Sequence, residues 1–98
     1  HFHNTRNTGL ANAYAAVAAG VRTLDASIAG LGGCPFAPGA SGNVATEDVV
    51  MMLGQMGLDT GIDLRRLMQA AQLAQELTGT APGGRASAWL KRRLDRAR

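Results

Sequence analysis

The chain has 98 residues, of which 46% are hydrophobic and 4% aromatic, and its formal net charge is +3. This composition is typical of a globular protein rather than a disordered one, and no stretch approaches the roughly 20 apolar residues of a membrane span. A single cysteine excludes an internal disulfide and favours a reducing, cytoplasmic setting. Six of the ten basic residues lie within residues 85–98, so the positive charge belongs to the C-terminal tail.

The first third of the sequence alternates between strand and helix patterns. "HFHNT" at residues 1–5 alternates in polarity and predicts a strand end that places His1 and His3 on one face. Residues 9–20 carry apolar side chains at helical spacing and finish on a glycine that can end the helix. Period-two apolar residues within 21–30 then predict a buried strand.

Two helix patterns follow the glycine-rich loop that comes after this strand. Thr46 is a good N-cap for the first, and Glu47 and Asp48 favour its positive end. Asp63 is a cap for the second, which runs up to Gly79 with an apolar stripe of Leu64, Leu67, Met68, Ala71, Ala74 and Leu77. A "GTAPGG" linker and a short basic amphipathic segment end the chain.

This order of elements indicates parallel β/α units. Strands alternate with helices at the spacing that such units require. Two strands are too few for a parallel sheet that is covered on both faces. We therefore expect an α/β fold whose remaining strands belong to a longer protein.

The two histidines at residues 1 and 3 form the first candidate site. Neutral imidazole is the commonest metal-binding side chain, and two of them on one strand face converge on a single point. A simple pair of polar residues at a strand end fits the same spacing. If the chain truly starts at His1, its free amino group and His3 could instead bind Cu(II) or Ni(II) in a square-planar site.

The loop "GLGGCPFAPGASGN" at residues 30–43 is the second candidate site. It holds five glycines, two prolines and Cys34, the only cysteine. A loop that follows the C-terminal end of a strand is where barrel enzymes place catalytic residues, and a thiol there could exchange a proton with a substrate. Asn43 offers a neutral oxygen suited to a hard cation. Alternatively, Cys34 is a small buried apolar residue and Asn43 a turn residue before the helix.

These motifs together resemble the C-terminal part of the hydroxymethylglutaryl-CoA lyase family. The similarity runs from residue 1 to about 68, is dense through residues 20–50, and is most specific in the Gly-Cys-Pro loop. It implies the last two β/α units of a (β/α)8 TIM barrel, an incomplete barrel with extra C-terminal helices. The chain would then comprise barrel units over 1–57, an additional helix over 58–79, and a basic linker and tail over 80–98.

The resemblance also implies an activity and a set of site residues. The reaction is retro-Claisen cleavage of 3-hydroxy-3-methylglutaryl-CoA to acetyl-CoA and acetoacetate, a step of leucine degradation and ketone-body formation. His1, His3 and Asn43 would be ligands of a Mg²⁺ or Mn²⁺ ion, and His1 also counts among the catalytic residues. Cys34 would lie in a mobile loop over the site and help to protonate the acetyl-CoA carbanion.

Two departures from the family pattern limit these expectations. Asn4 stands where the animal enzymes have aspartate, which bears on substrate preference. The family's aspartate ligand and catalytic arginine come from the first barrel strand, which is absent here, so we expect the isolated chain to be inactive. The sequence does not fix the acyl group of the substrate, so longer branched 3-hydroxyglutaryl-CoA thioesters are alternative substrates.

The expected partner is an acyl-CoA substrate, with no nucleic acid and no membrane, and the parent protein could form a homodimer. A related acyl-CoA condensing synthase is the alternative enzyme, although its loop usually lacks the Gly-Cys-Pro run. The tail "RASAWLKRRLDRAR" could suggest contact with nucleic acid or an acidic membrane, but a solvated helix or frayed terminus is expected instead.

Overall fold

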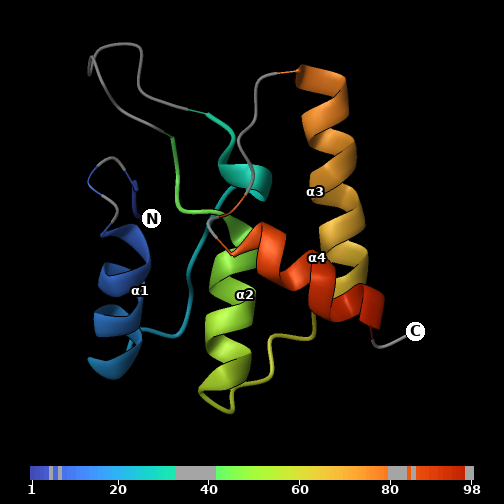
Figure 1. Cartoon of the computed structure of the whole chain (residues 1–98). Coiled ribbons are helices and arrows are strands. Elements are labelled where there is room, and N and C mark those ends of the chain that lie inside the picture. The colour runs from blue at the N-terminus through green and yellow to red at the C-terminus, as the bar shows by residue number, and fades with distance from the viewer. Residues whose placement is uncertain (5, 7, 33–41, 80–83, 85, 97–98) are drawn as a thin grey trace.

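The computed structural model describes residues 1–4, 6, 8–32, 42–79, 84 and 86–96. Its elements are α1 (Gly9–Ala18), a 3₁₀ turn η1 (Ile28–Gly30), α2 (Thr46–Gln55), α3 (Leu64–Thr78) and α4 (Ser87–Arg96). Figure 1 shows α2 between α1 and α3, with α4 crossing beside α2 and α3. The packing follows this picture, because α2 contacts α1, α3 and η1, and α3 contacts α4.

The two predicted strands do not form as strands in the described part of the chain. Backbone pairing there consists of two isolated bridges, an antiparallel one between His3 and Asn43 and a parallel one between Ser27 and Ala45. The prediction of strands over 1–5 and 21–30 is therefore wrong for this structure. A parallel strand needs hydrogen-bonding neighbours far away in sequence, and here only the short segment before α2 supplies them.

The helix predictions are confirmed in kind, with corrections at their ends. Asp63 is the N-cap of α3, where its Oδ1 accepts the Arg66 N–H at 3.2 Å, and Gly79 ends that helix at φ 69°. For α2 the N-cap prediction is wrong, because Ala45 occupies that position and Thr46 is already helical. Glu47 and Asp48 do lie in the first turn of α2, but they are buried there.

The core lies along α2 and on the helix faces directed toward it. Its buried apolar residues are Ala13, Ala29, Val44, Ala45, Val49, Val50, Ala71 and Leu90. Within the predicted apolar stripe of α3, Ala71 is buried but Leu77 is 77% exposed, so the stripe is not buried along its whole length. The C-terminal turns of α3 extend past α2 and α4 in Figure 1.

The basic tail forms α4 and is not a purely solvated helix. Leu90 is only 2% exposed, and the Arg65 guanidinium on α3 donates a hydrogen bond to the Leu94 carbonyl at 3.0 Å. Trp89 stays half exposed, with the Arg93 guanidinium 5.4 Å from its ring centroid. No helix within the described residues is long and apolar enough to cross a membrane.

Candidate functional site

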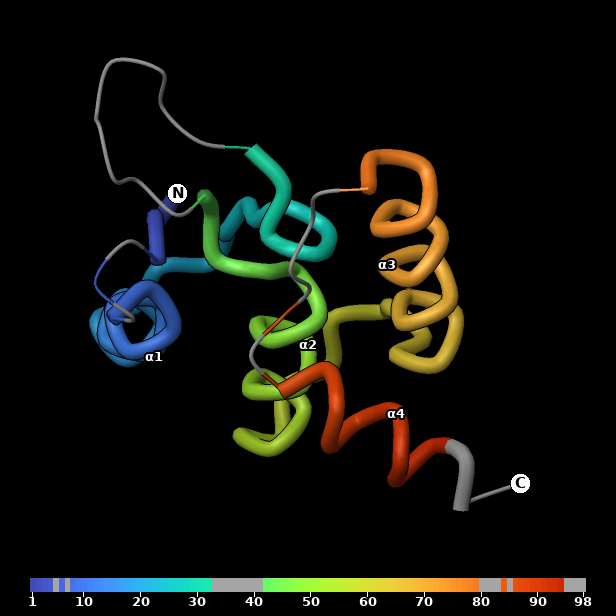
Figure 2. The backbone as a smooth tube through the Cα atoms, turned by 45° about the horizontal axis from the view of Figure 1, so that its top comes forward, coloured from blue at the N-terminus to red at the C-terminus, as the bar shows by residue number. Residues whose placement is uncertain are grey.

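The structure brings His1, His3 and Asn43 to one place through backbone pairing. The His3–Asn43 bridge is flanked by two hydrogen bonds, from the Val44 N–H to the Phe2 carbonyl at 3.1 Å and from the Asn4 N–H to the Gly42 carbonyl at 3.2 Å. In Figure 2 the N-terminus accordingly lies beside the segment that leads into α2. The two imidazole rings meet edge to face, with their centroids 5.0 Å apart.

Asn43 supplies the oxygen donor of this candidate site. Its Nδ2 donates to the Leu31 carbonyl at 2.9 Å, which fixes the amide plane. Its Oδ1 is buried and has no hydrogen-bond partner among the described residues. A buried oxygen without a partner costs free energy, about 1–3 kcal/mol, unless something binds it. An amide oxygen on the residue paired with His3, together with two imidazoles, is a donor set that suits a divalent cation, so these residue types fit the metal that the family resemblance implies.

Asp25 is a neighbour of this site that the sequence analysis did not assign. The Nδ1 atom of His1 is in hydrogen-bond contact with the Asp25 carboxylate. A signal for it does exist in the sequence. Asp25 alternates with the apolar residues at 24, 26 and 28, so it belongs on the opposite face of that segment. Histidine, cysteine, aspartate and glutamate alone form no group of three within the described residues that could bind a metal.

The central part of the glycine loop, including Cys34, lies outside the described residues. Both ends of the loop are described, and they lie against each other. A Cβ added to Gly42 would come within 2.4 Å of the Gly30 carbonyl oxygen and 2.5 Å of that of Gly32. The two ends of the loop, Gly30 to Gly32 and Gly42, therefore lie in close contact next to Asn43. We call this contact the neck of the loop.

Glu47 and Asp48 connect α2 to backbone segments that are distant in sequence, one of them next to this neck, a role that the sequence analysis missed. Glu47 is fully buried, where Oε1 accepts the Ala29 N–H at 2.9 Å and Oε2 accepts the Gly84 N–H at 3.2 Å. The Asp48 carboxylate accepts the Ala86 N–H at 3.0 Å. Both carboxylates thus bind backbone amides of other segments, so their assignment to the helix dipole is incomplete. Sequence spacing could not show this, because the donors lie 18 to 38 residues away.

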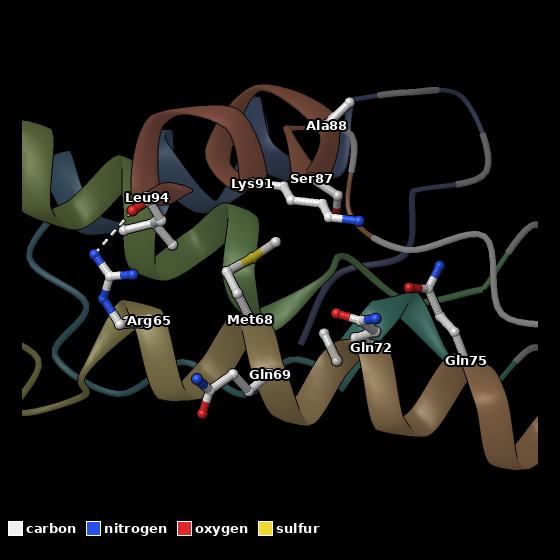
Figure 3. A pocket seen from close by; sticks show the side chains of 10 residues that line it. Arg65, Met68, Gln69, Gln72, Gln75, Ser87, Ala88, Lys91 and Leu94 are labelled. Atoms are coloured by element: carbon white, nitrogen blue, oxygen red, sulfur yellow. Dashed lines mark hydrogen bonds between the residues drawn. The ribbon is translucent and has the colours of Figure 1, made fainter. Parts of the chain in front are cut away.

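A separate groove lies between α3 and α4 (Figure 3). It has a volume of about 310 Å³ and is lined by residues that include Arg65, Met68, Gln72 and Lys91. The Arg65–Leu94 hydrogen bond crosses one end of it. His1, His3 and Asn43 are not among its lining residues, so the candidate metal ligands belong to a different site.

Comparison with known proteins gives the chain a class. Residues 1–74 match the HMGL-like family model. The chain belongs to the HMGL-like family.

Individual relatives of the chain are named as acyl-CoA lyases. The chain is 50% identical over 96 residues to hydroxymethylglutaryl-CoA lyase of Pseudomonas mevalonii, covering 98% of this chain and 32% of the relative. It is 56% identical over 71 residues to (R)-citramalyl-CoA lyase of Chloroflexus aurantiacus, covering 72% of this chain and 22% of the relative.

Among solved structures, the chain matches an HMG-CoA lyase from Acinetobacter baumannii in complex with coenzyme A and 3-methylmalate. The TM-score is 0.82 at 49% identity, covering 90% of this chain and 29% of that one. The chain thus spans about a third or less of the proteins it matches. The HMG-CoA lyase structures are TIM barrels. The prediction that this chain is related to the TIM-barrel fold is therefore confirmed.

Proposed function

We propose that this chain is the C-terminal part of the TIM barrel of a divalent-metal-dependent lyase that cleaves 3-hydroxy-3-methylglutaryl-CoA to acetyl-CoA and acetoacetate. The similarity to named HMG-CoA lyases over nearly the whole chain supports the reaction class. The observation that carries the proposal is the buried Oδ1 of Asn43, which has no hydrogen-bond partner within the described part of the chain and lies on the residue paired with His3.

His1, His3 and Asn43 would hold the cation in this proposal, together with ligands from elsewhere in the protein. A bound Mg²⁺ or Mn²⁺ would lower the proton affinity of the tertiary hydroxyl of the substrate. The hydrogen bond from Asn43 Nδ2 to the Leu31 carbonyl fixes the amide plane, so Oδ1 is the amide atom that would be left to bind the cation. Asn43 would therefore be a preorganised donor, because its amide is fixed before the cation binds.

The net reaction transfers one proton from the tertiary hydroxyl to the acetyl carbon and cleaves one C–C bond. Loss of the hydroxyl proton turns the alcohol carbon into the ketone of acetoacetate, and the adjacent C–C bond breaks. The electron pair of that bond becomes the enolate of acetyl-CoA. We assign the Cys34 thiol as the group that helps to return a proton to the enolate carbon. The glycine loop would exclude water during this step, since its two ends meet at the neck beside Asn43.

The test uses the complete protein that contains this chain, because the chain spans about a third of its relatives. Acetyl-CoA release from 3-hydroxy-3-methylglutaryl-CoA is measured with and without Mg²⁺, for the unaltered protein and for Cys34→Ala. We expect metal-dependent release that falls by at least about 100-fold in Cys34→Ala. Release that is independent of metal, or unchanged in the variant, would contradict the corresponding part of the proposal.

A second pair of variants tests the ligand set. Asn43→Ala should weaken Mn²⁺ binding, measured by titration calorimetry, whereas Asn12→Ala on the exposed side of α1 should leave it unchanged.

Because one relative is named (R)-citramalyl-CoA lyase, citramalyl-CoA belongs in the acetyl-CoA release assay as a competing substrate. Condensation of acetyl-CoA with a keto acid, without cleavage, would instead favour the synthase alternative.

The proposal extends to the division of the chain and to its setting. Residues 1–57 would form the last two β/α units of the barrel, 58–79 an additional helix and 80–98 the basic tail. The homodimeric state of the parent and its cytoplasmic location stay predictions.

A further inference from the structure

We propose that Asp25 is a positioning residue for His1, and that it selects the ring nitrogen with which His1 binds the cation. This inference rests on the cation site of the proposed function and adds a residue to it. The observation behind it is the contact between the Asp25 carboxylate and Nδ1 of His1.

The backbone explains why these two side chains meet. Residues 2–4 and residue 27 both hydrogen-bond to the segment over 42–46, through the Val44 N–H to Phe2, the Ser27 N–H to Val44 and the Thr46 N–H to Ser27. Two segments that are distant in sequence are thereby held against the same short stretch that carries Asn43. Asp25 lies two residues before Ser27, on the same face of an extended segment, and so comes within reach of His1.

The chemistry of the contact fixes the tautomer of His1. A carboxylate only accepts hydrogen bonds, so the Nδ1 atom that faces Asp25 must carry the proton. In the neutral imidazole the lone pair then resides on Nε2, which is the nitrogen left to bind a metal. Histidine ligands commonly donate their second ring N–H to a carboxylate in this way, which orients the ring and raises its basicity.

A purely stabilising role does not account for the pair. The side chains of His1 and Asp25 are 49% and 71% exposed. Exposed ion pairs contribute only about 0–1 kcal/mol to folding, because solvent screens them. The main physical consequence of the contact is therefore the orientation and protonation pattern of His1.

The first experiment measures Mn²⁺ affinity of the complete protein by titration calorimetry. We expect Asp25→Ala to weaken binding about 10- to 100-fold and Asp25→Glu to restore part of the loss. The matched control is Glu76→Ala, which removes an exposed carboxylate on α3 and should change the affinity less than about 2-fold. Equal affinities in Asp25→Ala and the unaltered protein would overturn the role of Asp25 and leave the cation site intact.

The second experiment reads the tautomer without metal. In protein with ¹⁵N-labelled histidine at a pH where His1 is neutral, the ring-nitrogen shifts of His1 should show a proton on Nδ1 in the unaltered protein. Asp25→Ala should lose that preference, with the His1 signals assigned through His1→Gln. A proton on Nε2 in the unaltered protein would overturn the inference. Failure of the unaltered protein to bind Mn²⁺ would overturn the cation site itself, and with it the role proposed for the contact between Asp25 and His1.

Discussion

The carboxylate of Glu47 accepts the backbone N–H of Ala29 at 2.9 Å, which joins the first turn of α2 to the start of the glycine loop. Ala29 has a φ of 56°, a left-handed conformation that costs energy for any residue with a side chain. The other oxygen of Glu47 accepts the Gly84 N–H. One buried side chain thus connects α2, the residue that precedes the glycine loop and the segment that leads into α4.

Replacement of Glu47 should therefore be costly. Glu47→Ala leaves two amide donors without their acceptor and opens a cavity, so we expect a loss of about 2–5 kcal/mol in the free energy of unfolding. Urea denaturation of the complete protein measures this. Glu76→Ala, on the exposed surface of α3, should stay within about 0.5 kcal/mol. Similar values for the two variants would show that the buried bonds of Glu47 contribute little.

A matched pair of glycines tests the neck of the loop. Gly42→Ala would force a Cβ to within 2.4 Å of the Gly30 carbonyl oxygen at a φ of 96°, so the two ends of the loop would have to separate. We expect a loss of more than about 2 kcal/mol and of most lyase activity. In Gly54→Ala a Cβ meets nothing within 4 Å, and the helical site should gain about 0.5–1 kcal/mol. Thermal unfolding and the acetyl-CoA assay together report both effects.

The docking of α4 can be measured at Leu90. This side chain is 2% exposed, so Leu90→Ala should cost about 2–5 kcal/mol if the helix stays packed in the complete protein. Its neighbour Trp89 is 50% exposed and mainly stacks with Arg93, so Trp89→Ala should cost only about 0.5–1 kcal/mol. The reverse order in urea denaturation would mean that α4 packs through its other face.

The start of α3 offers a prediction that depends on a single hydrogen bond. Asp63→Ala removes the acceptor for the Arg66 N–H and should destabilise the protein by about 1 kcal/mol, whereas Asp63→Asn should retain most of the cap. Equilibrium unfolding of both variants provides the comparison. Equal losses in Ala and Asn would point to the exposed Asp63–Arg66 ion pair instead of the cap.

Several elements could be predicted from the sequence because their causes are local. The helices follow from apolar residues at helical spacing. Asp63 begins α3 and Gly79 ends it through interactions within a few residues. The strands could not be predicted in the same way, since a strand requires a partner and here only isolated bridges at residues 3 and 27 form. Leu77 shows the same limit, because a helical pattern gives the apolar face but not the length of helix that is covered.

By itself, the sequence predicted the helices through the spacing of its apolar residues, and its motifs resembled a family in which His1, His3 and Asn43 would be metal ligands. Only the tertiary structure decided which groups meet across long separations in the chain. It left Oδ1 of Asn43 buried with no partner among the residues that the structure describes. It also brought Asp25 into contact with His1, and it made Glu47 the acceptor for amides 18 and 37 residues away. The physical reason is that these contacts depend on how the backbone segments pair and pack, and no local pattern in the sequence specifies that.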